Sequence, residues 1–576
     1  MIKTGAEIII ECLLRENVEV AFGIPGGVAL PLFDKIYGSK LKFVLTRHEQ
    51  GAAHMADGYS RSSGKVGVCI ATSGPGATNL VTGLATAYMD SVPVIAITAQ
   101  VISTSIGNDA FQEADITGIT RPITKHNFLV KDVKELAQVI REAFHIASTG
   151  RQGPVLVDVP TDIQRAETEF VWPKKIEIRS YQPNYFGHPG QIRRAAKLIN
   201  ESKKPVLYIG GGVIASGAER EVIELSKKAD IPVTATLLAL GAYPVDSPRY
   251  LGMLGMHGLY QANHAIQKSD LVIAVGARFD DRCTGKLSAF APKAKIIHID
   301  IDPTSISKSV LAHIPVVGDA SNILSELNKK VKKNSHKEWL ETIKKWAKEN
   351  PLAYKHDQVL RPQFVIEKIS EITKGNAIVV TEVGQHQMWS AQFYKPAGSR
   401  LFLSSGGLGT MGYGFPAGIG AKVANPGKDV IVIAGDGSFQ MNIQELATAV
   451  LNKINVKVAI LNNGCLGMVR QWQEMFYGKR YSASNLTCGT LTGIKTGAVS
   501  KGKERSGYTP DFVKVAEAYG AVGLRISAKK DVIPAIKKAL KIDRPVVMEF
   551  MVAPGENVLP MVPAGHALDE IITSYA

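Results

Sequence analysis

The sequence has no apolar run long enough to cross a membrane. Its strongest runs, such as Asp270–Gly276, are far shorter than the roughly 18 residues that a membrane-spanning helix needs. The first stretch, Met1–Asn17, has an amphipathic pattern with an early acidic residue, not a charged leader before an apolar segment. We therefore expect no signal or transit peptide and no membrane partner.

Cysteine is scarce as well. The 576 residues contain five cysteines, and none of them forms a Cys-x-x-Cys pair. A disulfide framework would need paired cysteines at regular spacings, so this pattern suits a reducing compartment. We expect a cytoplasmic protein.

A nucleic-acid-binding pattern is missing, although the net charge is +15. The lysines gather in surface-helix and linker patterns such as Lys329–Lys333, without interleaved aromatic residues or a recognisable reader motif. Solvated faces, with a field mildly favourable to anionic substrates, explain the charge better than a nucleic-acid partner does.

What the sequence does contain is a repeated alternation of strand and helix patterns. With 45% apolar and 21% charged residues the chain is globular, and at 576 residues it is too long for one core. It divides into three blocks, residues 1–165, 190–335 and 363–553, joined by polar stretches at 167–189 and 329–362. Apolar strands alternating with helices predict the α/β class, with three doubly wound domains and parallel sheets covered on both faces. Blocks one and three are candidates for one duplicated architecture.

Residues 431–463 carry the most informative pattern. An apolar run ends in Gly435-Asp436-Gly437, an amphipathic stretch follows, and a second apolar run ends in Asn462-Asn463. This order predicts a right-handed strand–helix–strand unit, which brings Asp436 and Asn463 to the same sheet edge. Carboxylate and amide oxygens beside glycine backbone suit a Mg²⁺ ion that also holds a diphosphate. Each motif alone is an ordinary turn signal, but the two at this spacing favour a ligand site.

This pair of motifs resembles the diphosphate-anchoring signature of thiamine-diphosphate enzymes. Nearly the whole chain resembles the catalytic subunits of acetohydroxyacid (acetolactate) synthases. The resemblance implies N-terminal pyrimidine and C-terminal diphosphate domains flanking a central FAD-type domain, with thiamine diphosphate, Mg²⁺ and FAD as cofactors. The implied metal ligands are Asp436, Asn463 and the main-chain carbonyl of Cys465.

Glu49, in the run Arg47-His48-Glu49-Gln50, is the acid for which the resemblance implies the central catalytic role. In the family a glutamate at this point contacts the pyrimidine ring nitrogen of the cofactor. A carboxyl group there favours the imino tautomer, whose nitrogen can take the proton from the thiazolium carbon. An isolated acid is usually a surface residue, but in this frame we expect a buried, protonatable carboxyl.

The resemblance also implies residues on the substrate side. Lys125 is a candidate to meet the carboxylate of a 2-oxo acid as a point charge, with an exposed surface lysine as the alternative. Trp472 would favour 2-oxobutanoate over pyruvate through one extra methyl contact, worth about 1–3 kcal/mol. The other implied residues on this side are Gly26, Gly27, Phe111 and Gln112.

Further cofactor contacts are implied in blocks two and three. Met411 is the implied apolar wedge that bends thiamine diphosphate, and a plain core methionine is the alternative. The implied diphosphate-side residues, which include a loop after a predicted strand, are Gln385, His386, Gly409, Gly435, Gly437, Ser438 and Met468. The implied FAD contacts are Gly210, Gly211, Gly212, Met256, His257, Arg278, Asp280, Arg282, Asp300 and Asp319.

The resemblance implies a synthase that decarboxylates pyruvate on thiamine diphosphate. The hydroxyethyl carbanion would then add to pyruvate or 2-oxobutanoate, the first common step of branched-chain amino-acid biosynthesis. The resemblance implies a homodimer or tetramer, with the cofactor between block one of one chain and block three of its partner, and a separate regulatory small subunit. Two alternatives stay open: a pyruvate oxidase or other FAD- and thiamine-dependent carboligase, and a catalytically silent paralogous subunit.

One stretch departs from the family pattern. Residues 483–508 are rich in Gly, Ser, Thr and Lys and are longer than the usual connector. They predict a surface loop beside the active-site lid, either inert or altering lid closure, subunit contacts or cofactor affinity.

Overall fold

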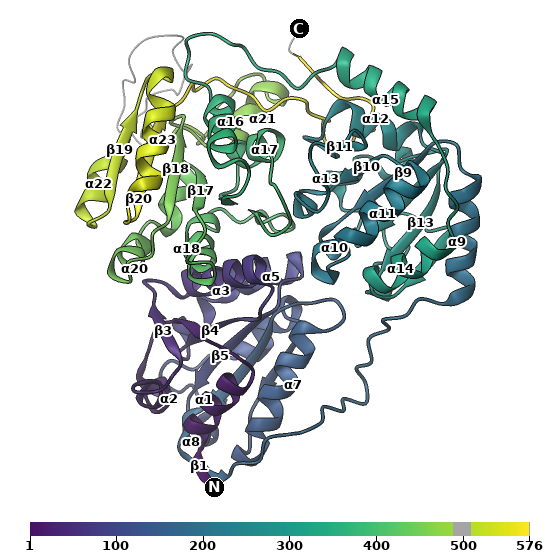
Figure 1. Ribbon diagram of the computed structural model, residues 1–576. Helices are drawn as coiled ribbons and strands as arrows, with labels where there is room; N and C mark the ends of the chain where they lie inside the picture. The colour runs from purple at the N-terminus through teal and green to yellow at the C-terminus, as the bar shows by residue number, and fades with distance from the viewer. Residues whose placement is uncertain (488–508, 575–576) are drawn as a thin grey trace.

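The computed structural model describes residues 1–487 and 509–574, so most of the predicted loop at 483–508 lies outside the described residues, as does Cys488. Within the described chain the strands form three six-stranded sheets and one two-stranded ribbon. Every strand pairing inside the three large sheets is parallel. The predicted α/β class with three parallel-sheet domains is confirmed (Figure 1).

The first domain has the strand order β3-β2-β4-β5-β7-β6. Its strands are β2 (Val20–Gly23), β3 (Lys42–Leu45), β4 (Gly67–Ala71), β5 (Val94–Gln100), β6 (His126–Leu129) and β7 (Val155–Pro160). One face is covered by α1 (Gly5–Arg15), α2 (Leu30–Ile36) and α7 (Leu136–Ser148), and the other by α3 (Glu49–Ser63) and α5 (Val81–Asp90). The short helices are α4 (Pro75–Thr78), α6 (Ile116–Thr120) and α8 (Thr161–Arg165), and the ribbon pairs β1 (Ile2–Thr4) with β8 (Glu167–Glu169).

The central domain has the order β11-β10-β9-β12-β13-β14. Its strands are β9 (Pro205–Ile209), β10 (Val233–Ala235), β11 (Tyr250–Met253), β12 (Leu271–Val275), β13 (Lys295–Asp300) and β14 (Ile314–Val317). The helices are α9 (Pro189–Glu201), α10 (Gly211–Ser216), α11 (Glu219–Ala229) and α14 (Ala320–Lys330) on one face, and α12 (Tyr260–Lys268), α13 (Asp281–Thr284) and α15 (Lys337–Glu349) on the other. The strand order reverses between β9 and β12, and open α/β sheets bind ligands outside the carboxyl ends of the strands at such a switch point.

The third domain has the order β16-β15-β17-β18-β20-β19. Its strands are β15 (Ile378–Thr381), β16 (Phe402–Leu403), β17 (Val430–Gly435), β18 (Lys457–Asn462), β19 (Val522–Ile526) and β20 (Val546–Met551). The helices are α16 (Pro362–Thr373), α17 (Gln385–Phe393), α18 (Gly414–Ala424), α19 (Asp436–Phe439), α20 (Glu445–Leu451), α21 (Gly467–Phe476), α22 (Phe512–Ala518) and α23 (Val532–Lys541). If the strands of each domain are numbered along the chain, both this domain and the first have the sheet order 2-1-3-4-6-5. The two domains therefore share one topology, as the sequence suggested.

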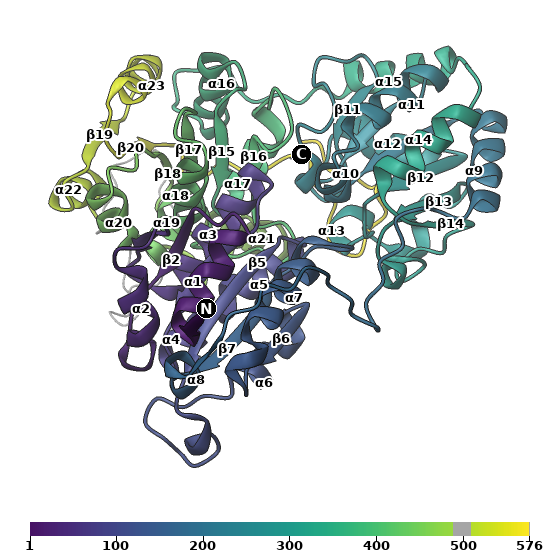
Figure 2. The same cartoon turned by 60° about the horizontal axis from the view of Figure 1, so that its bottom comes forward.

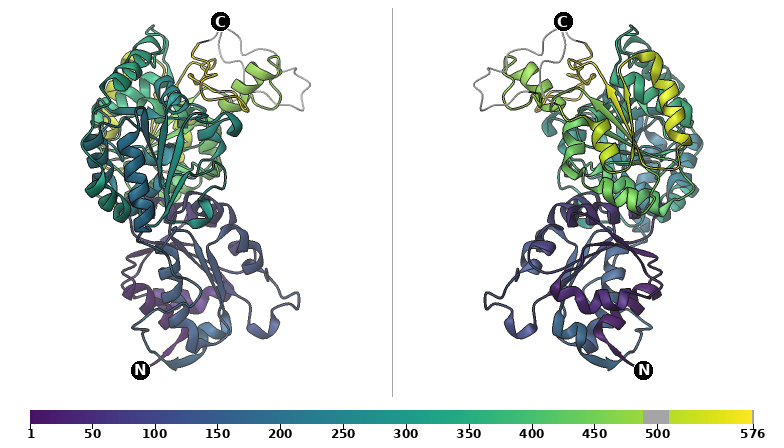
Figure 3. Two further views of the ribbon diagram at one scale, coloured as in Figure 1. Left: turned by 90° about the vertical axis from the view of Figure 1, so that its right-hand side faces the viewer. Right: turned by 90° about the vertical axis from the view of Figure 1, so that its left-hand side faces the viewer.

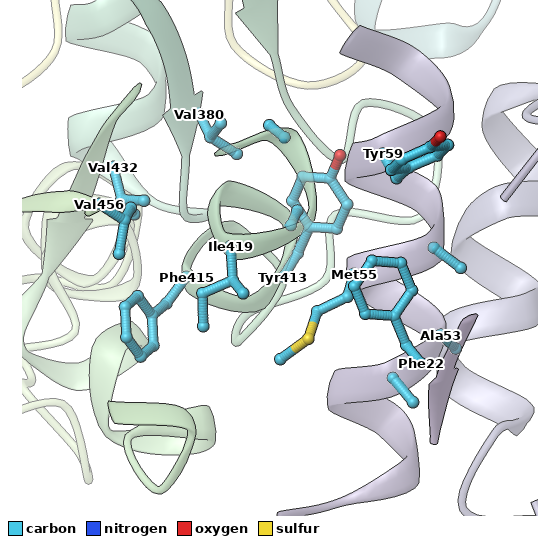
Figure 4. Packing of buried hydrophobic residues seen from close by; sticks show 14 of the residues in the cluster. Phe22, Ala53, Met55, Tyr59, Val380, Tyr413, Phe415, Ile419, Val432 and Val456 are labelled. Carbon is cyan, nitrogen blue, oxygen red and sulfur yellow. The ribbon is translucent and has the colours of Figure 1, made fainter. Parts of the chain in front are cut away.

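The first and third domains also share one hydrophobic core. Buried side chains of α3 and β2 pack with side chains of α18, β15 and β17 in a single cluster (Figure 4). Two glycines allow the helices α3 and α18 to cross closely: a Cβ atom at Gly58 would lie 2.0 Å from the Ala417 carbonyl oxygen, and one at Gly420 would lie 1.9 Å from that of Met55. Any larger residue at either position would force the two domains apart.

A buried ion-pair network joins the same two domains. Arg61 on α3 donates from Nε to Asp57 at 2.6 Å and from Nη2 to Asp90 at 2.8 Å. Its Nη1 donates to the Ser404 carbonyl at 2.9 Å, and the Tyr413 hydroxyl donates to Asp57 at 2.8 Å. Burial raises the pKa of Asp57, and Arg61 opposes that shift. Arg61 therefore neutralises two buried carboxylates at the boundary between the two domains, and Tyr413 adds a second hydrogen bond across it.

Two segments differ from the sequence-based expectation. Part of the polar stretch at 329–362 is the helix α15, whose Trp339 is buried against the central domain. The chain beyond 553 is also structured: it returns to the central domain, where Val562 N–H donates to the Met256 carbonyl at 2.7 Å and Leu568 is buried (Figure 1). In α15 the apolar residues Trp339, Ile343 and Trp346 lie on one side of the helix and pack on the central domain, so the polar composition of the stretch concealed a helical pattern.

Among residues 1–487 and 509–574, no helix combines the length and the apolarity that a bilayer crossing requires.

Candidate cofactor and catalytic site

The predicted metal-binding residues lie together at one sheet edge. Because β17 and β18 are neighbouring parallel strands, Asp436 and Asn463 follow them side by side, as the strand–helix–strand pattern predicted. The Asn463 N–H points to Asp436 Oδ1 at 3.4 Å, and Asn463 Oδ1 accepts from the Cys465 N–H at 3.1 Å. No group of three or more His, Cys, Asp or Glu side chains suited to a metal was found in the described part of the chain. One carboxylate, one amide oxygen and a carbonyl are nevertheless the hard oxygen donors that Mg²⁺ takes when substrate phosphates complete its shell.

Gln385 and His386 occupy the first turn of helix α17, not the loop that we expected, because the helix begins directly after Gly384. Gln385 Oε1 accepts from Asn463 Nδ2 at 3.3 Å. His386 lies against the glycine before Asp436, since a Cβ atom at Gly435 would be 2.9 Å from its ring. Burial lowers the pKa of His386 to about 3, so the ring is neutral.

His386 also supplies a test of whether a diphosphate fits here. Its Nε2 atom is buried and has no hydrogen-bond partner among the described residues. A neutral imidazole can donate from this nitrogen, and the amino end of a helix attracts negative charge. A phosphate oxygen beside α17 would satisfy both, so the residues present fit a diphosphate.

Glu382, which the sequence analysis missed, links the two loops around this edge. It directly follows β15 and is fully buried. Its carboxylate accepts hydrogen bonds from Ser438 Oγ at 2.7 Å, Gly412 N–H at 2.8 Å and Phe415 N–H at 3.0 Å. Burial raises the pKa of Glu382 to about 7. Its bonds place the turn that contains Gly437 and Ser438 against the loop that contains Gly409 and Met411. An acid directly after a buried strand was the available signal.

A cavity of about 670 Å³ lies at the switch point of the central domain and extends to the third domain. Every residue predicted to contact FAD lines it: Gly210, Gly211, Gly212, Met256, His257, Arg278, Asp280, Arg282, Asp300 and Asp319. Three buried polar atoms of its lining, Thr236 Oγ1, His257 Nδ1 and Trp472 Nε1, lack a hydrogen-bond partner in the described structure. A cavity of this size with unsatisfied polar atoms fits an elongated ligand with polar groups along its length.

Some of these FAD-side residues also have local structural roles. Asp280 caps α13 by accepting from the Arg282 N–H at 2.9 Å, and Asp319 caps α14 by accepting from the Asn322 N–H at 3.2 Å. Gly210 and Gly212 follow β9 and pack on Gly276, where a Cβ atom at Gly210 would lie 2.2 Å from the Gly276 carbonyl oxygen. The glycines therefore bring the β9–α10 turn close to β12, which shapes the cavity floor.

The first domain contributes a lining residue that sequence reasoning missed. Arg151 donates from Nε to Ser91 Oγ at 2.9 Å and from Nη1 to Asp302 Oδ2 at 3.1 Å. Arg151 and Ser91 line the cavity, and Asp302 does not. No motif marked Arg151, since it precedes β7 in an ordinary loop. It therefore brings a guanidinium group of the first domain to the cavity lining, where Asp302 holds it in place.

The cavity lining also includes Met411, Met468 and Trp472. Met468 and Trp472 are four residues apart on α21, so they lie on the same side of the helix. Gly384, which directly precedes α17, and Gly409 also line the cavity. The structure thus places Met411 and Trp472, the residues implied to shape the cofactor and to select the second 2-oxo acid, in the lining of the same cavity.

Glu49 begins α3 at the carboxyl edge of the first sheet and is 8% exposed. Its Oε2 accepts from Asn79 Nδ2 at 2.9 Å, which orients the carboxyl group. Gly26 lies nearby, because Thr72 connects it to Glu49: a Cβ atom at Gly26 would be 2.4 Å from Thr72, and one at Gly76 would be 2.7 Å from Thr72 and 3.3 Å from Glu49 Oε1. Gly27 follows Gly26 after β2. Neither Glu49 nor these glycines are among the described residues that line the cavity. Within one chain, therefore, the two halves of the predicted site do not open into one space.

Phe111 and Gln112 lie on an excursion between β5 and α6 that projects from the first domain (Figures 2 and 3). The side chain of Phe111 is 87% exposed. Gln112 has a left-handed backbone with φ of 59°, and its backbone lies against Gly74 in the turn after β4. The excursion therefore returns to the first domain at Gln112, beside the turn after β4, and leaves the neighbouring Phe111 side chain exposed.

Lys125 does not lie with the other predicted site residues. It precedes β6, at the amino edge of the first sheet, whereas Glu49 and Gly26 follow strands at the carboxyl edge. Its Nζ donates to the carbonyls of Ile146 and Thr149 and to the Tyr181 hydroxyl. Burial lowers the pKa of Lys125 to about 7. Three acceptors use all three ammonium hydrogens at the end of α7, so this geometry does not support a contact with a substrate carboxylate.

Three family models match the chain, one in each domain. Residues 3–119 match the thiamine pyrophosphate enzyme N-terminal TPP binding domain, residues 192–327 the central domain, and residues 382–550 the C-terminal TPP binding domain. The acetolactate synthase large subunit of Mycobacterium tuberculosis is 51% identical over 99% of this chain and 91% of its own length. The large subunits of Corynebacterium glutamicum and Cyanidium caldarium are 50% and 46% identical over 99% of this chain, and over 90% and 97% of their own lengths.

Proposed function

The chain belongs to the acetolactate synthase large subunits of the thiamine pyrophosphate enzyme family, and from this premise we propose that it forms acetolactate from pyruvate. One pyruvate loses CO₂, and its remaining two-carbon unit joins the carbonyl carbon of a second 2-oxo acid, pyruvate or 2-oxobutanoate. The observation that carries the proposal is the edge after β17 and β18, where Asp436 and Asn463 lie next to the wall of Met411, Met468 and Trp472.

The third domain would hold the diphosphate and its metal. Asp436 Oδ, Asn463 Oδ1 and the Cys465 carbonyl are the proposed Mg²⁺ ligands, and His386 Nε2 with the first turn of α17 would bind a phosphate oxygen. Gln385 holds Asn463, and Glu382 holds the Gly437–Ser438 turn, so both keep the donors in place. Bound thiamine diphosphate would supply the nucleophilic carbon and the electron sink of the reaction.

The first domain would supply the acid that acts on the pyrimidine ring. Glu49 is the proposed partner of a ring nitrogen, where it would hold or release one proton. The amide of Asn79 holds one of its oxygens, and the other would meet the ring nitrogen when the cofactor is bound. Burial excludes water from this carboxyl group, which favours proton transfer to the ring over exchange with solvent.

We propose that two chains complete each site. Glu49 lies outside the cavity lined by Met411 and Trp472 of its own chain, and Phe111 on the projecting excursion is exposed. A homodimer in which the first domain of one chain meets the third domain of the other would join the two halves and cover Phe111. A tetramer could pair such dimers, and a separate regulatory small subunit and a cytoplasmic location belong to the same proposal.

FAD is the proposed ligand of the cavity in the central domain. Its glycine turn after β9, its carboxylates near β13 and β14 and the unsatisfied Thr236 hydroxyl suit a dinucleotide at a topological switch point. The flavin would have a structural role in this reaction, since joining two 2-oxo acids with loss of CO₂ transfers no net electrons.

An assay of the purified protein with pyruvate, thiamine diphosphate and Mg²⁺, with and without FAD, tests the proposal. We expect acetolactate, detected as acetoin after acid treatment, and its loss in Glu49→Gln. Acetyl phosphate or acetate formed with peroxide would instead identify an oxidase. No turnover despite bound cofactors would identify a silent subunit, although the presence of Glu49, Asp436 and Asn463 argues against that outcome.

A further inference from the structure

Glu445 connects the predicted metal-binding segment to the turn that precedes Glu49. It is the first residue of α20, on the connection from β17 to β18 that begins with Asp436. Its side chain is fully buried. It reaches out of the third domain, because the Arg47 N–H donates to its two carboxylate oxygens at 3.0 and 3.3 Å.

The contact between Glu445 and the first domain is close and specific. A Cβ atom at Gly51, in the first turn of α3, would lie 2.6 Å from Glu445 Oε1. Thr448, one turn further along α20, donates to Glu445 Oε2 at 2.6 Å. The Glu445 carboxylate is therefore held by Thr448 of its own helix and contacts the backbone at Arg47 and Gly51, on both sides of Glu49.

The same connection also touches the Met411 loop. Asn442, three residues before Glu445, donates from Nδ2 to the Gly412 carbonyl at 2.7 Å. The segment from Asp436 to Glu445 thus contacts the metal edge, the wedge loop and the Glu49 turn in succession. Few residues separate these contacts along the chain.

We propose that Glu445 is a positioning residue, which holds the Arg47–His48 backbone and thereby fixes where the Glu49 carboxyl stands. A carboxylate that accepts from a backbone N–H in a water-free interface forms a strong, charge-assisted hydrogen bond. Glu49 is two residues beyond Arg47, so its position depends on that bond. This inference rests on the proposed function, in which Glu49 acts on thiamine diphosphate.

In the proposed dimer this role acquires a further consequence. The metal edge of one chain and the Glu49 of the same chain would belong to two different cofactor sites. Glu445 would then be the direct physical link between those sites within each chain.

The first experiment measures hydrogen exchange of the amides of residues 46–49 in the cofactor-free protein by mass spectrometry. We expect the rate to rise from wild type to Glu445→Gln, which keeps one acceptor oxygen, and again to Glu445→Ala. The rise in Glu445→Ala should be about 10- to 100-fold, the range set by loss of a hydrogen bond to a charged group. Asp57→Asn is the matched control, because Asp57 is also a buried acid at the interface of α3 but lies two turns from Glu49. In Asp57→Asn the exchange rates of the amides of residues 46–49 should equal those of wild type.

The second experiment measures exchange of the thiazolium proton of bound thiamine diphosphate against deuterium by NMR at saturating cofactor and Mg²⁺. We expect Glu445→Gln to slow this exchange about tenfold or more, with the dissociation constant of the cofactor within about threefold of wild type. Unchanged amide exchange at 46–49 would overturn the proposal, and so would loosened amides with unaltered proton exchange.

The two experiments separate this inference from the proposed function. If the wild-type protein fails to accelerate the thiazolium exchange, the proposed function fails, and the amide rates alone decide whether Glu445 holds the turn. If Glu445→Ala does not fold, the isosteric Glu445→Gln still gives the comparison, and its melting temperature shows whether it is folded.

Discussion

The guanidinium carbon of Arg282 lies 5.7 Å from the centre of the Trp472 ring, so a residue of the central domain meets a residue of the third domain across the cavity. A contact of this kind contributes about 0.5–1 kcal/mol at a partly exposed site. The buried Trp472 Nε1 has no hydrogen-bond partner in the described residues, so apolar packing and Arg282 together set the ring position. The shape of this wall therefore depends on two domains at once.

Replacing Trp472 should change which second 2-oxo acid is used. In Trp472→Leu we expect the ratio of 2-aceto-2-hydroxybutanoate to acetolactate to fall about tenfold or more, since a methyl contact contributes roughly 1–3 kcal/mol. A competition assay with pyruvate and 2-oxobutanoate measures the ratio. Trp346→Phe, on α15 far from the cavity lining, is the control and should leave it unchanged. An unaltered ratio in Trp472→Leu would remove this residue from acceptor selection.

Replacing Arg61 should weaken the joint between the first and third domains. Arg61→Met leaves Asp57 and Asp90 buried without their cation, and we expect a loss of about 3–5 kcal/mol. Thermal unfolding measured by calorimetry should show a lower melting temperature. Lys345→Met, which removes an exposed pair with Glu349, should have an effect of at most about 0.5 kcal/mol. Equal effects of the two variants would contradict the structural role of the network.

Glu382 should make stability depend on pH. Its pKa is raised from 4.5 to about 7 in the folded protein, so between these values the folded state keeps a proton that the unfolded chain has released. The contribution to stability is fully present below pH 4.5 and is lost as the pH rises to about 7, by at most about 1.4 kcal/mol per pH unit. Melting temperatures across this range should fall less steeply in Glu382→Gln than in wild type. Glu338→Gln, at an exposed position, should follow wild type.

Removing the predicted metal ligand should abolish stabilisation by the cofactor. A ligand at a hundred times its dissociation constant stabilises a protein by about 2.7 kcal/mol. Thiamine diphosphate with Mg²⁺ should therefore raise the melting temperature of wild type, and chelation of Mg²⁺ or the substitution Asp436→Ala should remove the shift. Asp34→Asn, an exposed acid of the first domain, should keep it. A full shift in Asp436→Ala would place the metal elsewhere.

Lys125 allows a direct test between the sequence-based role and the structural one. If its ammonium group serves the end of α7, Lys125→Met should lower stability by about 1–3 kcal/mol and leave the KM for pyruvate within about twofold. Steady-state kinetics and calorimetry on the same preparation measure both. A large rise in KM with unchanged stability would restore the predicted contact with the substrate carboxylate.

Local patterns in the sequence were sufficient for several elements. The apolar runs that end at Gly435 and at Asn462 appear in the structure as the strands β17 and β18, because a short apolar run between polar turns has few other stable conformations. Asp436 and Asn463 were placed correctly for the same reason: two consecutive parallel strands must end at one edge.

Lys125 and Glu382 show where such patterns failed. The resemblance implied a substrate contact for Lys125, with a surface lysine as the alternative, but the sheet edge at which it lies depends on whether it precedes or follows a strand. Glu382 follows a strand and is fully buried, but its partners Gly412, Phe415 and Ser438 are 30 to 56 residues away. No periodic pattern encodes contacts at that separation.

The sequence by itself determined the three parallel-sheet domains, the sheet edge at which Asp436 and Asn463 meet, and the family to which the chain belongs, because short-range alternation of apolar and polar residues and closely spaced motifs encode them. Only the tertiary structure decided that the first and third domains share a core through Gly58 and Gly420, that Arg151 joins the cavity wall, and that Glu445 reaches the turn before Glu49. Those contacts arise when separately folded units pack together, and their geometry depends on shapes that residues distant in the chain form jointly.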